Sequence, residues 1–195
     1  MIGEAPLQRV EDLLSADAFA EVLRITRPRR GKHDVYGNLQ EKPFLRPILT
    51  AVREAFPEVS DKRMQQVLLR FEGRTGLLHH DQNHRPDRTH SLLYYVDQPE
   101  RGGEVVFPFF DASGLPTENP VTRACRVLSA RDKLYAEDPA LEAWIVAHRD
   151  TLLTVTPRAN SVLLFPSAHE PMWHYVCPVE AGHRSCVVIF FHKKG

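Results

Sequence analysis

The stretch "LLHHDQNHRPDRTHSLLYYVD" (residues 77–97) places a cluster of histidines and aspartates directly before an apolar run that is typical of a β-strand. Within the cluster, His79 and Asp81 are two positions apart. On an extended segment such residues project from the same face, whereas His80 between them projects from the other face. The stretch therefore offers one imidazole and one carboxylate together, which is two of the three protein ligands of an open metal site.

A third ligand is available far downstream. His174 lies between the apolar run "SVLLFP" (residues 161–166) and the last apolar run, "RSCVVIFFH" (residues 184–192). Two histidines and one carboxylate form the facial triad of non-haem Fe(II) oxygenases, and this triad leaves about three coordination positions open. We expect several other histidines to be solvated or structural rather than ligands: His84, His90, His148, His169, His183 and His192. His80 is expected to lie beside the ligands or at the surface.

The fold class follows from the order of the predicted elements. Helices are predicted at residues 15–26, where Ser15 is a candidate N-cap, and at about 45–56. Short β-branched or aromatic runs then predict strands at 64–71, 90–97, 103–110, 151–157, 161–166 and 184–192. This order indicates a mainly β protein with flanking α-helices, built on a double-stranded β-helix core of the jelly-roll or cupin-like type. We expect one domain over residues 1–195, with N-terminal helices at about 1–60 and the jelly-roll core at about 61–195.

Residues 111–150 interrupt the series of strands. The first half of this insertion is rich in Gly, Pro, Thr and Asn and predicts a loop. The second half contains "DPALEAWIVAHRD", which predicts a helix with Asp138 as N-cap and Pro139 in the first turn. We expect the insertion to be a substrate-facing lid, since long loops on compact domains often cover active sites. The alternative is a helix packed permanently on the outer face of the barrel.

Composition and charge exclude several other classes of protein. Lys and Arg number 25, as do Asp and Glu, so no general charge favours nucleic acid or an anionic membrane, and we expect neither partner. The N-terminal residues lack the basic and apolar regions of a signal peptide, and no apolar run is long enough to span a bilayer. The three cysteines have no C-x-x-C spacing, which argues against a zinc knuckle or a disulfide framework. A cytoplasmic location is expected.

As an ensemble, the motifs resemble those of a known family. "HHD", "YYVD", "GGEVVF", "LLF" and "HYVCPVEAGHR" follow one another in the order found in the prolyl-4-hydroxylase-like branch of the Fe(II)/2-oxoglutarate-dependent oxygenases, over about residues 64–192. The stretch "HHDQNHRPDRTHSLLYYVD" is similar to that of protein prolyl hydroxylases of the oxygen-sensing type. Two departures are the long insertion and Phe71, the nearest aromatic residue where the family often has a tyrosine.

The resemblance implies a cofactor, a co-substrate and the residues that hold them. It implies Fe(II) bound by His79, Asp81 and His174, with 2-oxoglutarate and O2 as co-substrates and ascorbate as a candidate reductant. It also implies that Arg184 binds the distal carboxylate of 2-oxoglutarate and that Tyr95 donates a hydrogen bond to it. The chemistry agrees, because a planar guanidinium grips a carboxylate bidentately and a phenol adds a directed donor.

The activity implied by the resemblance is a dioxygenase reaction that hydroxylates an unactivated C–H bond and releases succinate and CO2. Asp81 favours hydroxylation, since related halogenases have a small residue at this position. We expect a small-molecule substrate, such as an amino acid or a biosynthetic intermediate. The alternatives are a prolyl or peptidyl-residue hydroxylase and a non-catalytic, metal-binding, cupin-like sensor, although a sensor would not need Arg184.

Three residues are expected to border the substrate pocket: Arg88, His90 and Trp173. Arg88 and His90 follow the H-x-D segment, and Trp173 adjoins His174. The alternatives are that Arg88 forms a salt bridge in the loop and that Trp173 packs in the core.

Overall fold

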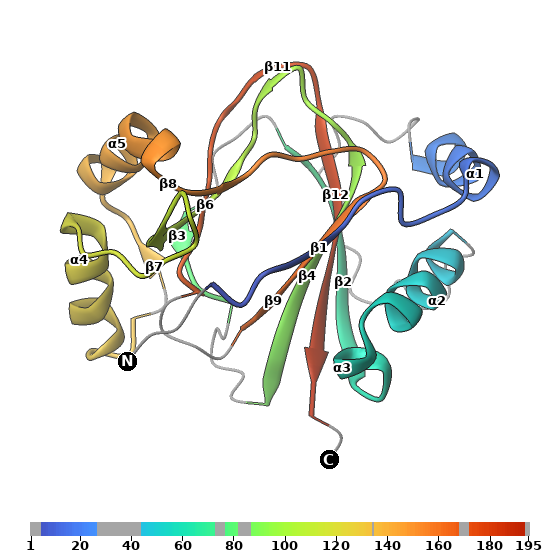
Figure 1. Ribbon diagram of the computed structural model, residues 1–195, viewed down its shortest axis with the longest axis horizontal. Helices are drawn as coiled ribbons and strands as arrows, with labels where there is room; N and C mark the ends of the chain where they lie inside the picture. The colour runs from blue at the N-terminus through green and yellow to red at the C-terminus, as the bar shows by residue number, and fades with distance from the viewer. Residues whose placement is uncertain are drawn as a thin grey trace.

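Five antiparallel strands form the larger sheet of the protein, in the order β1-β9-β4-β12-β2 (Figure 1). The computed structural model describes residues 5–26, 44–72, 77–81, 87–133, 135–167 and 172–193. The strands of the larger sheet are β1 (Gln8–Val10), β2 (Arg63–Glu72), β4 (Arg88–Asp97), β9 (Ser161–Pro166) and β12 (Arg184–His192).

A smaller sheet of three strands, in the order β10-β6-β8, lies across from the larger one. Its strands are β6 (Val105–Asp111), β8 (Leu152–Val155) and β10 (Tyr175–Val176). Two-stranded ribbons complete the β structure: β3 (Leu78–His79) with β7 (Tyr135–Ala136), and β5 (Arg101–Gly102) with β11 (Val179–Ala181). The two facing sheets confirm the predicted jelly-roll type of core.

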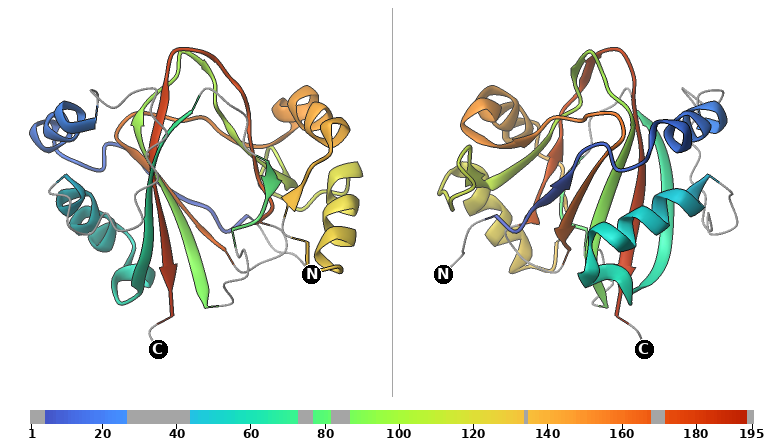
Figure 2. Two further views of the ribbon diagram at one scale, coloured as in Figure 1. Left: turned by 180° about the vertical axis from the view of Figure 1, so that it is seen from behind. Right: turned by 45° about the vertical axis from the view of Figure 1, so that its right-hand side comes forward.

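Helices cover the outer faces of both sheets, as the two views of Figure 2 show. The helices α1 (Ala16–Thr26), α2 (Leu45–Ala55) and α3 (Pro57–Ser60) lie against the larger sheet. The helices α4 (Pro120–Ser129) and α5 (Pro139–His148) lie beside the smaller sheet, and a short 3-10 helix, η3 (Arg149–Thr151), leads from α5 into β8. The predicted helices at 15–26 and about 45–56 are confirmed, and the Ser15 hydroxyl accepts a hydrogen bond from the backbone N–H of Ala18 at 3.4 Å.

The burial pattern of β4 explains why this strand is a continuous apolar run. Leu93 and Tyr95 belong to the core cluster between the two sheets. Leu92 and Tyr94 point the other way, into a second core cluster under α1 and α2. Both faces of a strand need apolar residues when both are covered. The same alternation holds in β12.

All six predicted strands are present, but the run at 103–110 forms a strand, β6, only from Val105 onward. Gly102, directly before this run, ends β5 with a φ of 80°. A Cβ atom on Gly102 would lie 2.1 Å from the carbonyl oxygen of Pro178, so only glycine fits this close approach. The paired glycines therefore separate the β5-β11 ribbon from the smaller sheet.

The insertion at 111–150 is more regular than the sequence analysis expected. The prediction of a loop over its first half was wrong for residues 120–129, which form α4. Asn119 and Thr122 form a capping box there, and Pro120 occupies the first turn. The prediction for the second half is confirmed, since Asp138 caps α5 by accepting from the N–H groups of Ala140 and Leu141.

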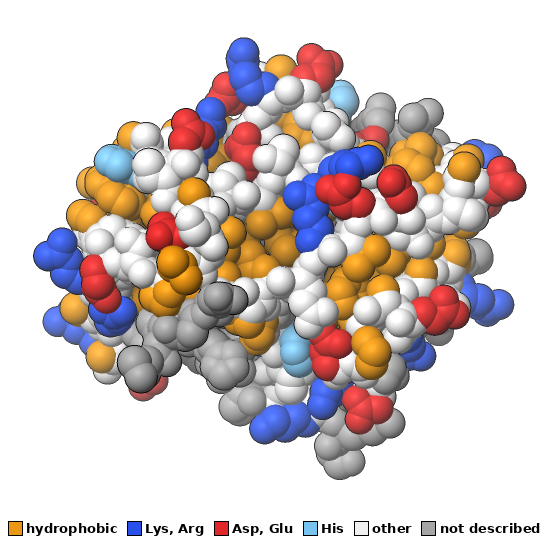
Figure 3. Space-filling view, viewed as in Figure 1, with side chains coloured by type: hydrophobic (Ala, Val, Ile, Leu, Met, Phe, Trp, Pro, Cys, Tyr) orange, Lys and Arg blue, Asp and Glu red, His pale blue; other side chains and the backbone are white. Residues whose placement is uncertain are grey.

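Charged side chains of both signs alternate on the face seen in Figure 3, around a central area of exposed hydrophobic side chains. No broad patch of Lys and Arg is visible on this face. Within the described ranges, no helix is both long and apolar enough to cross a membrane.

We predict that Asn119→Ala lowers the free energy of unfolding by about 1–2 kcal/mol, as loss of a good N-cap does. Asn119 is buried, and its amide also donates to the Pro108 carbonyl at 2.7 Å. Denaturant unfolding measures the change. Asp138→Ala is the matched control, because it removes the exposed cap of α5 and is expected to cost less. An equal loss of unfolding free energy in the two variants would contradict the expectation that the buried cap contributes more than the exposed one.

Candidate metal centre

The backbone brings His79 and His174 together although they are far apart in the sequence. His79 ends β3, and His174 directly precedes β10. Each residue donates its backbone N–H to the carbonyl of the other, at 3.0 Å and 2.7 Å. Directly paired residues of two strands project from the same face, and the two imidazole rings accordingly have centroids 4.3 Å apart.

Asp81 completes the cluster expected from the sequence. Its carboxylate oxygens lie 3.4 Å from Nε2 of His79 and 3.8 Å from Nε2 of His174. One potential ligand atom from each residue lies within 4.8 Å of the others. This spacing suits three donors around one divalent ion.

The hydrogen bonds of both rings leave the correct nitrogen available. Nδ1 of His79 lies 2.5 Å from the Leu77 carbonyl, and Nδ1 of His174 lies 3.0 Å from the Met172 carbonyl. A carbonyl oxygen only accepts, so each Nδ1 carries the proton. Each Nε2 then directs a lone pair toward the space beside Asp81, which is how histidine ligands are oriented in metal sites.

Burial and neighbouring charges set the protonation states that a metal requires. Burial lowers the pKa of His174 to about 4, and His79 adds to this effect, although Asp81 opposes it. Burial by itself would raise the pKa of Asp81, but His174 and His79 outweigh it and hold this pKa well below its usual range. At neutral pH, His174 is therefore neutral and Asp81 is a carboxylate. This donor set fits Fe(II).

The cavity beside the three residues is lined mainly by apolar side chains and by Arg184. Besides His79, Asp81 and His174, its walls consist of Leu93, Val176, Arg184, Cys186, Val188 and Phe190. Arg184 is 2% exposed. A Cβ on Gly103 would lie 3.0 Å from Cδ of Arg184, so the second glycine of the pair leaves room for the arginine side chain.

Tyr95 lies next to Arg184, as the sequence analysis expected. The carbon at the centre of the guanidinium is 5.5 Å from the centre of the Tyr95 ring. Burial raises the pKa of Tyr95 to about 12, although Arg184 opposes this shift. Tyr95 therefore remains a protonated phenol, and thus a hydrogen-bond donor, at neutral pH.

The structure places Arg88 against the metal centre, but in a buried position. Arg88 is 5% exposed, its guanidinium stacks over the Phe190 ring at 3.7 Å, and it donates a hydrogen bond to the Asp81 carbonyl. Arg88 thus supports the backbone of Asp81 from β4. Ser91 is the next residue of β4 that faces the metal centre, and it also helps to lower the pKa of Asp81. Sequence reasoning missed Ser91, whose only signal was a polar residue in an otherwise apolar run.

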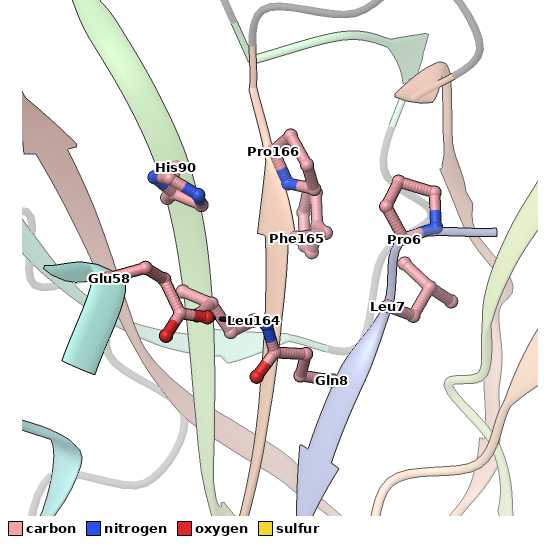
Figure 4. A pocket seen from close by; sticks show the side chains of 8 residues that line it. All are labelled: Pro6, Leu7, Gln8, Glu58, His90, Leu164, Phe165 and Pro166. Carbon is pink, nitrogen blue, oxygen red and sulfur yellow. Dashed lines mark hydrogen bonds between the residues drawn. The ribbon is translucent and has the colours of Figure 1, made fainter. Parts of the chain in front are cut away.

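His90 lies away from the metal centre. It lines a separate pocket of about 260 Å³ with residues of β1, α3 and β9, shown in Figure 4. His90 faces the opposite side of the sheet from its neighbour Ser91. A register shift between His90 and Arg88 interrupts the alternation, so Arg88 can face the same side as Ser91. The structure therefore does not bring His90 to the cavity that the sequence analysis expected it to border.

Trp173 is also turned away from the cavity, since its neighbour His174 faces it. Trp173 is fully buried, and its indole N–H donates to the Ser129 hydroxyl at 3.1 Å. Its ring meets the ring of His80 edge-on, with centroids 5.1 Å apart. This position corresponds to the core alternative for Trp173.

The remaining histidines differ in their surroundings. His148 contacts the Trp144 carbonyl through Nδ1 at 2.8 Å, and His192 contacts Asp87 through Nδ1 at 3.1 Å. His183 is exposed. His84 and His169 lie outside the described residues, as does the side chain of Phe71.

Comparisons with known proteins agree with this arrangement. A family model described as the 2OG-Fe(II) oxygenase superfamily matches residues 67–192. No curated protein matches the sequence.

Several solved structures share the fold. A collagen prolyl hydroxylase of Paramecium Bursaria Chlorella virus-1, in complex with 2OG, has 14% sequence identity and a TM-score of 0.60, covering 97% of each chain. A prolyl-4-hydroxylase of Pseudomonas putida has 14% identity and a TM-score of 0.53, covering 98% of this chain and 94% of that chain. HygX of Streptomyces hygroscopicus, with nickel and 2-oxoglutarate bound, has 14% identity and a TM-score of 0.58, covering 98% and 84%.

We predict that His79→Ala and His174→Ala weaken Fe(II) binding by more than about 100-fold, since even residues that only support metal ligands are worth about 10–100-fold. Anaerobic Fe(II) titration with iron analysis measures the effect. His80→Ala is the control and should largely retain iron, because His80 is not part of the cluster of candidate ligands. Full iron occupancy in His174→Ala would refute the assignment of this ligand.

Proposed function

Because the chain belongs to the 2OG-Fe(II) oxygenase superfamily, we propose that it hydroxylates an unactivated C–H bond of a small molecule, either an amino acid or a biosynthetic intermediate. Succinate and CO2 are the other products. One observation carries the proposal: the cluster of His79, Asp81 and His174 shares a single cavity with the buried Arg184. A carboxylate-binding group beside a metal site is what 2-oxoglutarate requires.

Each of these residues has a defined part in the proposed reaction. His79, Asp81 and His174 would hold Fe(II), which supplies the redox chemistry that couples 2-oxoglutarate decarboxylation to C–H oxidation. Arg184 pairs with the distal carboxylate of 2-oxoglutarate, and Tyr95 donates a hydrogen bond to it. The charge-assisted contacts are strong here, because the apolar walls of the cavity keep the local dielectric constant low.

The surroundings of the cluster support hydroxylation in a dry site. Leu93, Val188 and Phe190 line the cavity with apolar side chains, and such a lining would limit the water beside the reacting atoms. Asp81 supplies a third protein ligand, which leaves no protein-derived vacancy for a halide. Arg88 fixes the Asp81 backbone through its hydrogen bond to the carbonyl.

A small-molecule substrate agrees with the positions of the residues expected to bind substrate. Arg88 and Trp173 are buried, and His90 lines a different pocket. None of the three therefore provides a charged or aromatic anchor at the cavity for an extended peptide. A peptidyl hydroxylase is the second candidate, favoured by the fold that the chain shares with prolyl hydroxylases. A non-catalytic sensor would have no use for a buried arginine at the metal centre.

The test of the proposal is anaerobic titration with Fe(II) and 2-oxoglutarate. A metal-to-ligand charge-transfer band is expected, because 2-oxoglutarate chelates the ion. Succinate release is then measured with free amino acids, biosynthetic intermediates and proline-containing peptides. Release with a peptide alone would select the second candidate, and absence of the band would contradict both hydroxylases.

We predict that Arg184→Ala weakens 2-oxoglutarate binding by about two to three orders of magnitude, since breaking a buried ion pair costs about 3–5 kcal/mol and ~1.4 kcal/mol is tenfold. Tyr95→Phe removes one hydrogen bond to a charged group, worth about 1.5–3 kcal/mol. The charge-transfer band reports both affinities. Arg158→Ala is the control, because Arg158 is half exposed and pairs with Glu11 and Asp12. Unchanged affinity in Arg184→Ala would refute the assignment of Arg184 to this carboxylate.

A further inference from the structure

The insertion at 111–150 is hydrogen-bonded to the strand that carries His79. Its strand β7 pairs antiparallel with β3, so that Leu78 lies opposite Ala136 and His79 opposite Tyr135. Figures 1 and 2 show the two strands side by side. On its other edge, His79 is bridged to His174. A two-residue strand forms few hydrogen bonds of its own, so its place depends on both neighbours.

The ribbon formed by β3 and β7 is also fixed by packing. Leu78 is fully buried and Ala136 is 4% exposed, and both belong to the core cluster between the sheets. The alternate residues, His79 and Tyr135, project from the opposite face. Burial of one face therefore determines the direction in which the imidazole of His79 points.

Trp173 makes a second connection between the insertion and the metal centre. Its indole N–H bonds to Ser129, the last residue of α4. Its ring contacts His80, the residue between His79 and Asp81, while its own chain neighbour is His174. One side chain thus touches both ligand-bearing segments and the insertion.

The helix at the other end of this connection is anchored. The α4 residues Val121 and Cys125 are fully buried and belong to the same hydrophobic core cluster as Leu78 and Ala136. The capping box at Asn119 fixes the start of the helix. Ser129 is consequently held by the core of the barrel.

We propose that residues 111–150 are a positioning element of the metal centre, acting through β7 and through the hydrogen bond between Ser129 and Trp173. The proposal rests on the assignment of His79, Asp81 and His174 as ligands. Because β7 is bonded to the strand of His79, an insertion that swung open as a lid would release one ligand. The insertion therefore acts in its packed position, as the permanently packed alternative requires.

The experiment measures binding of Co(II), a spectroscopic substitute for Fe(II), to the purified apoprotein without 2-oxoglutarate. Trp173→Phe and Ser129→Ala each remove one partner of the same hydrogen bond and should weaken Co(II) binding by about three- to tenfold. The double variant should bind no more weakly than either single variant, since residues that act as one unit are not additive. The visible ligand-field band at saturating Co(II) should change in shape, and Ser129→Thr, which keeps the hydroxyl, should restore it.

Ala136→Pro tests the backbone connection, since proline disrupts strand pairing, and it should weaken Co(II) binding further. Thr154→Ala is the matched control: it deletes a 2.7 Å hydrogen bond to the Arg149 carbonyl, at the end of the insertion away from β3. Unchanged Co(II) affinity and spectrum in folded Trp173→Phe and Ser129→Ala would overturn the proposal. Failure of the ligand assignment is seen separately, as equal Co(II) binding by the wild type and His79→Ala.

Discussion

Two backbone hydrogen bonds between His79 and His174 determine the geometry of the metal centre. They join segments 95 positions apart and place both imidazoles on one face. Asp81 then reaches both rings because it lies two positions after His79 on the same face. Without this bridge, the H-x-D segment would be connected to the segment of His174 only through side-chain contacts such as that of His80 with Trp173. The two facing sheets serve to hold the bridge, since β10 follows His174 directly and pairs with β6.

Electrostatic interactions favour a cation at the position that the two backbone hydrogen bonds define. A buried carboxylate is unfavourable unless a positive partner compensates for it. Asp81 and the two imidazoles thus form a donor set that is favoured when a cation is present. Arg184 lines the same cavity, and in the proposed function a dianionic co-substrate would reach from the ion to its guanidinium. The fold therefore builds a site that is most stable when it is loaded.

Most of the fold could be predicted from local sequence patterns, and the rest depended on long-range pairing. The alternation and composition of the six apolar runs predicted their strands, and the capping residue Ser15 marked the first helix. The prediction failed at 120–129 because Asn119 and Pro120 were interpreted as loop residues rather than as a cap followed by a first turn. No local pattern could show that β7 pairs with β3, since a two-residue strand has no detectable period.

The candidate site was predicted in the same uneven way. The approach of His79, Asp81 and His174 was expected from spacing and resemblance, and their atoms do lie together. His90 was expected to border the cavity, but it lines a different pocket. The sequence alone does not show which face of β4 turns toward the metal centre. The position of Trp173 could not be predicted, because it depends on a hydrogen bond to Ser129 of α4 and α4 itself was not predicted.

The three candidate ligands differ in their access to solvent. The side chain of His79 is 26% exposed, whereas those of His174 and Asp81 are 5% and 9% exposed. The ligand that belongs to the short ribbon is thus the one that water can reach. Exchange of an ion would begin with dissociation of His79, while the other two residues keep their hold. The rate of metal loss from the proposed site would therefore depend on how firmly the two-residue strand β3 is held.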